Sequence, residues 1–130
     1  MLQTLFSMQG RINRAAFWGV SFGWLAAFVA VGGAVALTGV SGDDLNAAGY
    51  VGATLLLVMF FAALWSGLCI SVRRYHDLGK SGVWVLIYAV PVVGPVWYFV
   101  ETGCFRGEAG DNRFGPDPLN RLAANAFARA

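Results

Sequence analysis

Two long apolar stretches decide the fold. Residues 16–40 read AFWGVSFGWLAAFVAVGGAVALTGV, and residues 47–72 read AAGYVGATLLLVMFFAALWSGLCISV. Asp43 and Asp44 are the only charged residues between positions 15 and 72. About 20 apolar residues cross a bilayer as a helix, whereas an open strand cannot cross because lipid offers its backbone no hydrogen-bond partner. The two stretches therefore predict two transmembrane helices.

A third charge-free stretch covers residues 83–100, VWVLIYAVPVVGPVWYFV, and is interrupted by Pro91, Gly94 and Pro95. A proline removes a backbone donor and bends a helix. Eighteen helical residues extend about 27 Å, which just crosses a membrane, so we predict a third transmembrane helix that is kinked at Pro91 and Pro95. The alternative is a break at 91–95, which would make the stretch a re-entrant hairpin and return the tail to the side from which it came.

Composition supports this fold class, an all-α integral membrane protein. Of the 130 residues, 58% are hydrophobic and 12% are charged, about half the charged fraction of soluble domains. This excludes a soluble domain, a disordered tail and a nucleic-acid-binding protein. We expect a single membrane domain over residues 1–118, with spans at about 16–40, 47–72 and 83–100. Apolar residues at helical spacing then predict a short C-terminal amphipathic helix over residues 119–130.

The placement of charge predicts the orientation. Arg11 and Arg14 precede the first span, and the loop at 73–82 carries three further basic residues, whereas the short turn at 41–46 carries only acidic charges. Basic loops stay in the cytoplasm, so we expect a multi-pass protein with a cytoplasmic N-terminus and loop 73–82. The tail from Glu101 onward is neutral overall. It lies outside if the third span is complete and inside if that span is re-entrant.

Small residues recur at every fourth position on one face of each of the first two spans. They are Gly19, Gly23 and Ala27 in the first span, and Ala63, Gly67 and Ser71 in the second. Small faces let helix backbones approach closely in lipid. They indicate packing either between the helices of this chain or against a partner, which would be another copy or a larger membrane complex.

The stretch RRYHDLGKSG at 73–82 is the densest group of polar residues. Basic side chains beside a helix start attract phosphate groups, so any ligand here is expected to be an anionic lipid or another phosphate. The candidate binding residues are Arg11, Arg14, Arg73, Arg74, His76, Lys80 and Ser81. The structural alternative is that the cations fix the topology, that Asp77 pairs with a neighbouring cation and that His76 caps carbonyl groups.

Catalytic, metal-binding and cofactor-binding motifs are not evident in the sequence. Two Cys and one His are too few for a zinc site in one chain. Gly79-Lys80-Ser81 lacks the earlier glycine of a phosphate-binding loop. The predicted spans hold no acidic, basic or His residue, which argues against proton or ion coupling. We therefore expect no catalysis, no metal and no cofactor.

Four motifs occur in a specific order: GRINRAAFW at 10–18, RRYHDLGKSG at 73–82, PVVG at 91–94 and GDNRFGPDP at 110–118. Together they resemble the bacterial inner-membrane family filed as domain of unknown function number 805, over about residues 6–118. The resemblance implies a small multi-span protein of the bacterial inner (cytoplasmic) membrane and no established activity.

Three functions follow as hypotheses. The leading one is a non-enzymatic accessory or structural subunit that packs in the inner membrane and binds anionic lipid at its cytoplasmic loop. The alternative is a component of an oligomeric channel or transporter, which a re-entrant third segment would favour. A membrane enzyme that uses Arg74, His76 and Asp77 on a lipid substrate is the third.

Overall fold

The structure is a computed structural model that describes residues 5–37 and 47–120. Its helices are α2 (Arg14–Leu37), α3 (Ala47–Asp77), the 3-10 helix η1 (Gly82–Ala89), α4 (Val93–Tyr98) and the π-helical η2 (Phe99–Cys104). Within the described ranges no strand is present beyond an isolated bridge between Asn112 and Gly115. The all-helical prediction is therefore confirmed. The predicted turn at 41–46 and nearly all of the predicted helix at 119–130 lie outside the described residues.

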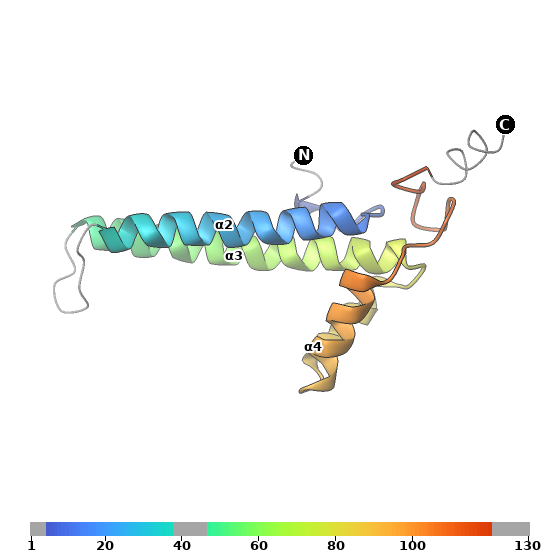
Figure 1. The fold of residues 1–130 in the computed structure, drawn as a ribbon. Coiled ribbons are helices and arrows are strands. Elements are labelled where there is room, and N and C mark those ends of the chain that lie inside the picture. Colours follow the sequence, from blue (N-terminus) through green and yellow to red (C-terminus); the bar gives the residue numbers. More distant parts are fainter. Residues whose placement is uncertain (1–4, 38–46, 121–130) are drawn as a thin grey trace.

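α2 and α3 lie side by side and antiparallel as a long shaft (Figure 1). Both are long and apolar enough to cross a membrane, as the first two stretches predict. Gly52 permits their close approach, because a Cβ there would lie 2.5 Å from Cγ2 of Val35. Most of the remaining shaft surface is apolar and exposed, including Val29 at 67% and Val58 at 62%. Such a surface suits lipid rather than water.

The ends of both helices are set by local signals. α2 begins at Arg14, where the Asn13 side chain accepts a hydrogen bond from the backbone N–H of Ala16 at 2.8 Å. α3 runs about one and a half turns beyond the apolar stretch. It stops at Gly79, whose φ of 73° favours glycine. The backbone N–H of Lys80 then bonds back to the carbonyl of Tyr75 at 2.9 Å, a standard glycine-based helix end.

The third apolar stretch is a helical hairpin, so the prediction of one kinked helix over 83–100 is wrong. The first leg, η1, ends at Ala89, and the second leg, α4 with η2, runs back beside it (Figure 1). Val92 at the tip has a φ of 65°, which no helix allows. A Cβ on Gly94 would lie 2.0 Å from the carbonyl oxygen of Ile87. Pro91 and Gly94 thus form a reversal, while Pro95 lies in the first turn of α4, where proline is tolerated.

The hairpin is closed at its base and held against α3. An ion pair joins Lys80, before the first leg, to Glu101, near the end of the second. The hydroxyl groups of Ser71 on α3 and Tyr98 on α4 are hydrogen bonded to each other. The small residues Ala63 and Gly67 line the groove between α3 and the hairpin. On the small face of α3, Ser71 is therefore packed inside the chain, while Ala63 and Gly67 border an open groove in which a Cβ on Gly67 would meet nothing within 4 Å.

Candidate functional site

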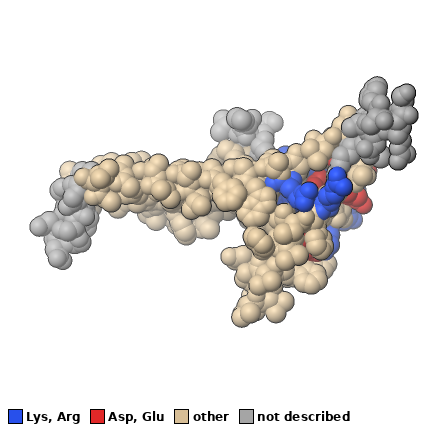
Figure 2. All heavy atoms as spheres, in the orientation of Figure 1, with Lys and Arg blue, Asp and Glu red and all other residues tan. Residues whose placement is uncertain are grey.

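Polar segments that are far apart in the sequence meet at one end of the shaft. Residues 5–13, 73–81 and 105–120 form this assembly, which we call the polar cap. Within the described ranges all charged residues lie in the cap or beside it, while the rest of the visible surface is uncharged (Figure 2). These ranges hold seven basic and five acidic residues. The cap is thus the part of the molecule where polar chemistry can occur.

Asp77, at the end of α3, is the centre of the cap. Its Oδ1 accepts hydrogen bonds from Nε and Nη2 of Arg11 at 3.1 and 3.0 Å. Its Oδ2 pairs with Nη1 of Arg74, one helical turn earlier. The Arg11 and Arg74 side chains are fully buried, and that of Asp77 is 2% exposed. Buried charges persist only when they are paired and hydrogen bonded, so these three residues form a structural unit.

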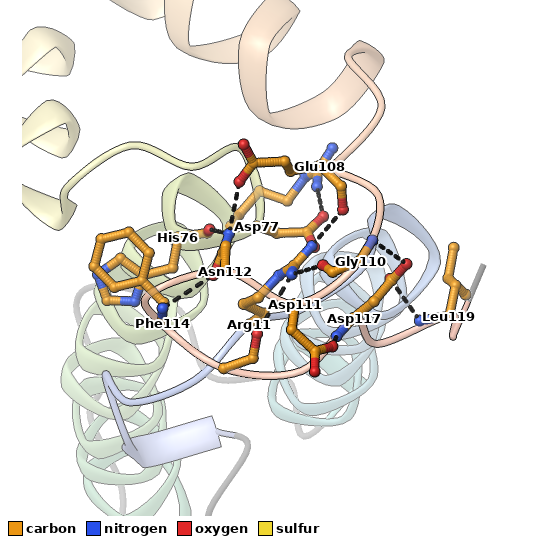
Figure 3. A network of polar contacts seen from close by, with 12 residues as sticks. Arg11, His76, Asp77, Glu108, Gly110, Asp111, Asn112, Phe114, Asp117 and Leu119 are labelled. Atoms are coloured by element: carbon orange, nitrogen blue, oxygen red, sulfur yellow. Dashed lines mark hydrogen bonds and ion pairs between the residues drawn. The ribbon is translucent and has the colours of Figure 1, made fainter. Parts of the chain in front are cut away.

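Backbone carbonyl groups accept the remaining donors of the two arginines. Arg11 bonds to the carbonyls of Glu108 and Gly110, as Figure 3 shows. Arg74 bonds to the carbonyls of Thr102 and Phe105, the first of these at 2.8 Å. The tail is thereby fastened to the ends of α2 and α3. A guanidinium group can do this because it offers five donors in a fixed plane.

The cap is closely packed around the Asp77 carboxylate. Gly107 passes so near that a Cβ there would lie 1.9 Å from Oδ2 of Asp77. The backbone N–H of Glu108 donates to the carbonyl of Asp77 at 2.7 Å. Glycine at 107 is therefore a steric requirement of the cluster.

A second set of contacts orders the tail beyond residue 110. The rings of His76 and Phe114 stack with centroids 3.9 Å apart (Figure 3). The Asn112 side chain donates to the carbonyl of His76 at 2.9 Å. Asp117 accepts hydrogen bonds from the backbone N–H groups of Gly110 and Leu119. The motif at 110–118 thus forms a compact turn on the end of α3.

The predicted site residues divide into two groups. Arg11 and Arg74 lie inside the cluster, Arg73 bonds to the Arg11 carbonyl at 3.4 Å, and His76 contacts the Gly10 carbonyl at 3.2 Å. Lys80 pairs with Glu101 and also lies 4.5 Å from the Trp84 ring centre. These contacts match the structural alternative. Their role in phosphate binding stays a prediction.

Arg14 and Ser81 lie apart from the cluster. Ser81 precedes η1 and makes no side-chain capping bond there. Arg14 is exposed and donates to the carbonyl of Cys104 at 2.8 Å. It lines a pocket of about 420 Å³ beside the first turn of α2. The lining comprises Asn13, Arg14, Ala15, Trp18, Asp77, Gly103, Arg106, Gly107 and Leu119.

Sequence reasoning missed several cap residues because they come from the tail. Thr102, Glu108 and Arg106 carried no local signal that ties them to α3. The Gly, Asn and Asp residues at 110–118 do predict turns from their composition, but nothing in the sequence indicates that these turns pack on the end of α3. In the described part of the chain, no group of three His, Cys, Asp or Glu side chains is placed to hold a metal ion.

Comparison with known proteins gives the chain its relatives. It is 35% identical to the inner membrane protein YhaH and 36% identical to the inner membrane protein YhaI, both of Escherichia coli (strain K12). These matches cover 50% and 49% of this chain, and 50% and 53% of the relatives. The chain thus spans about half the length of these curated relatives.

A third relative is similar over more of its length. It is the uncharacterized protein YiiR of the same strain, 27% identical, with 88% of each chain covered. No solved structure matches significantly. Residues 5–116 match the family described as "Protein of unknown function (DUF805)". That match takes in both shaft helices, the hairpin and almost all of the polar cap, so the chain belongs to the DUF805 family.

Proposed function

We propose that the protein is a non-enzymatic structural or accessory subunit of the bacterial inner membrane. The names of YhaH and YhaI place those relatives in the inner membrane, and two helices of this chain are fit to cross one. The basic residues at 73–80 and before α2 assign the polar cap to the cytoplasm by the positive-inside rule. α2 and α3 then cross the bilayer.

In this arrangement the hairpin enters only the cytoplasmic leaflet. Its exposed side chains are apolar, for example Val83 at 69%, Leu86 at 70% and Val92 at 81%. The eight residues of η1 rise only about 16 Å as a 3-10 helix, and the hairpin leans steeply away from the shaft (Figure 1), so it reaches less than half of the way across the 30 Å hydrocarbon core. The chain therefore has two complete spans and one half-inserted segment rather than three spans.

The proposal rests on the small face of α2 that carries Gly19 and Gly23, which the rest of the described chain leaves uncovered. Gly19 and Gly23 are exposed, and a Cβ at either position would meet no atom within 4 Å. The corresponding residues Ala63 and Gly67 of α3 border the groove beside the hairpin, whereas the α2 face lies away from the rest of the described chain. Glycines four residues apart favour close contact with the same face of a second helix. We assign this face to a second copy of the chain, which makes the protein a homo-oligomeric structural unit.

Substitution of both glycines tests the assignment. Gly19→Leu/Gly23→Leu leaves the contacts within the chain intact, so the fold is retained while self-association in bilayers falls at least several-fold. Energy transfer between labelled copies in lipid vesicles, measured over a range of protein densities, reports the association.

Two results decide the matter. Ala36→Leu, a similar change at an exposed position on a different face of α2, is the matched control and should associate as the unmodified protein does. The proposal is overturned if the unmodified protein is monomeric at all densities. It is also overturned if the double variant associates as well as the unmodified protein. The contact between copies would then lie on another face, or the glycine face would bind a different partner.

The topology has its own test. In a Cys69→Ala background, Cys104 is exposed at the base of the hairpin. An impermeant thiol reagent added to intact spheroplasts should leave it unlabelled and should label it after permeabilisation. A cysteine placed at Ser41, between the two spans, should be labelled in intact spheroplasts. Labelling of Cys104 before permeabilisation would contradict a cytoplasmic cap.

A channel or transporter component is the second candidate, because the hairpin is the feature that favours it. Non-helical backbone at membrane depth is typical of segments that line a water-filled path. In that case, cysteines at Val92 and Val93 should react with small water-soluble thiol reagents in the bilayer. In a lipid-facing hairpin the same positions should resist those reagents.

A further inference from the structure

The pocket beside the first turn of α2 differs from the rest of the polar cap in its cations. Arg106 is exposed and has no hydrogen bond or ion pair among the described residues. Arg14 uses one donor on the Cys104 carbonyl, which leaves most of its five N–H groups available. Both residues line a pocket whose volume of about 420 Å³ is within the range of small-molecule sites.

The acidic residue that lines the pocket does not cancel these charges. Asp77 is the single carboxylate among the lining residues, and Arg11 and Arg74 both pair with it. That cluster therefore carries a net charge of +1 by itself. Arg14 and Arg106 add two further positive charges, so the pocket is electropositive and attracts an anion.

The position of the pocket indicates what kind of anion it takes. Trp18 forms one wall, and its Nε1 donates to the Gly103 carbonyl at 3.3 Å. A tryptophan ring that combines apolar contact with a polar N–H is typical of the headgroup region of a membrane. Ala15 in the first turn of α2 also lines the pocket, where backbone N–H groups have no helical acceptor.

We propose that this pocket binds a phosphate group, with Arg14 and Arg106 as its two cationic ligands. The inference goes beyond the packing role and uses none of the residues assigned to self-association. An anionic phospholipid of the cytoplasmic leaflet is one source of such a group, and a soluble phosphate compound is the other. Arg106, rather than the paired residues Arg11 and Arg74, completes the site.

Equilibrium binding to the full-length protein tests the proposal. The probe is fluorescent phosphatidylglycerol, and fluorescent diacylglycerol, which has no phosphate group and no charge, is the comparison. Each basic residue near a membrane contributes about 1 kcal/mol of attraction to an anionic lipid. Arg14→Gln and Arg106→Gln should therefore each weaken phosphatidylglycerol binding about five-fold, and the double variant about 25-fold. The effect should shrink as salt is raised.

Arg113→Gln is the matched control. Arg113 is also exposed in the cap, but it lies over the Phe114 ring, 4.6 Å from its centre, and does not line the pocket. Its substitution removes the same net charge and should leave binding unchanged. Thermal unfolding of each variant confirms that the fold is intact, and Arg14→Lys/Arg106→Lys should retain more binding than the double glutamine variant.

Competition with glycerol 3-phosphate and inorganic phosphate separates the two sources. Displacement of the lipid probe at low millimolar concentration assigns the site to a soluble phosphate compound, and its absence assigns it to the lipid. Equal binding of the two fluorescent lipids, without binding of either soluble compound, overturns the proposal. Equal losses of phosphatidylglycerol binding in Arg113→Gln and in the pocket variants would overturn the proposal as well. The loss would then reflect the net charge of the whole cap surface rather than the pocket.

Discussion

Asp77 is the residue on which the polar cap depends most. It is nearly fully buried and pairs with two buried arginines. Removal of one partner from a buried ion pair costs about 3–5 kcal/mol, because the other charge is left uncompensated. Asp77→Asn should therefore lower the free energy of unfolding by about that amount, measured by denaturation in detergent micelles. Asp111→Asn, at an exposed acidic residue, should change it little, and equal stability of both variants would contradict the assigned role.

Gly107 offers a steric test of the same cluster. A methyl group there would overlap the Asp77 carboxylate, and forced overpacking costs about 1–3 kcal/mol. Gly107→Ala should lower the melting temperature, whereas Gly67→Ala should not, because a Cβ on Gly67 meets nothing within 4 Å. A melting temperature for Gly107→Ala at or above that of the unmodified protein would show that the cluster relaxes freely.

Local signals at the residue scale could be read from the sequence, and distant contacts could not. The pairing of Asp77 with a nearby cation is confirmed, and the Asn13 helix cap and the glycine helix end at Gly79 follow from signals of the same local kind. Each depends on residues within one or two turns. Arg11 as the second partner of Asp77 was missed because 66 positions separate them, and no spacing rule connects such residues.

The hairpin is the element for which sequence and structure differ most. Pro91, Gly94 and Pro95 are compatible with a kink and with a reversal, because both need a break in backbone hydrogen bonding. What selects the reversal is tertiary: the ion pair of Lys80 with Glu101 and the contact between the legs at Gly94. By contrast, α2 and α3 were predictable because continuous hydropathy alone determines them.

Crosslinking can measure the closure of the hairpin. In a protein without Cys69 and Cys104, Lys80→Cys/Glu101→Cys should be joined efficiently by a short bifunctional thiol reagent. A continuous helix would instead hold the two positions about 30 Å apart. Lys80→Cys/Val92→Cys, which pairs the base with the tip, should not crosslink. Failure of Lys80→Cys/Glu101→Cys to crosslink, as a continuous helix requires, would restore a third complete span.

At the scale of the whole molecule, the polar cap joins segments from both ends of the described chain. Arg11 and Arg74 both rely on tail carbonyl groups, those of Phe105, Glu108 and Gly110 among them. Truncation after Cys104 should therefore leave buried donors unsatisfied and reduce the steady-state amount of protein several-fold, because destabilised proteins are degraded. Immunoblots of membranes, with full-length Arg113→Gln as the control, report this. Equal amounts would show that the shaft is stable without the tail.

Four short motifs were enough to indicate the family from the sequence, and the structure shows what each of them builds. The motifs at 10–18, 73–82 and 110–118 supply the polar cap, and the motif at 91–94 supplies the tip of the hairpin. The sequence could place the three polar motifs at a membrane surface, but it put the motif at 91–94 inside the third span. It could not show that three of them meet, since that depends on the direction in which the third apolar stretch leaves the membrane.

A hairpin held in one leaflet makes the protein broader there than in the other. In the proposed topology, the cytoplasmic leaflet accommodates the shaft and the hairpin, whereas the opposite leaflet accommodates the shaft alone. Such an asymmetric inclusion favours bending of the bilayer with the broader side convex. On reconstitution into small vesicles, the cap should therefore point outward in most molecules, and this bias should fade as vesicle radius increases. Protease accessibility of the cap across vesicles of graded size measures the bias, and an orientation independent of radius would refute it.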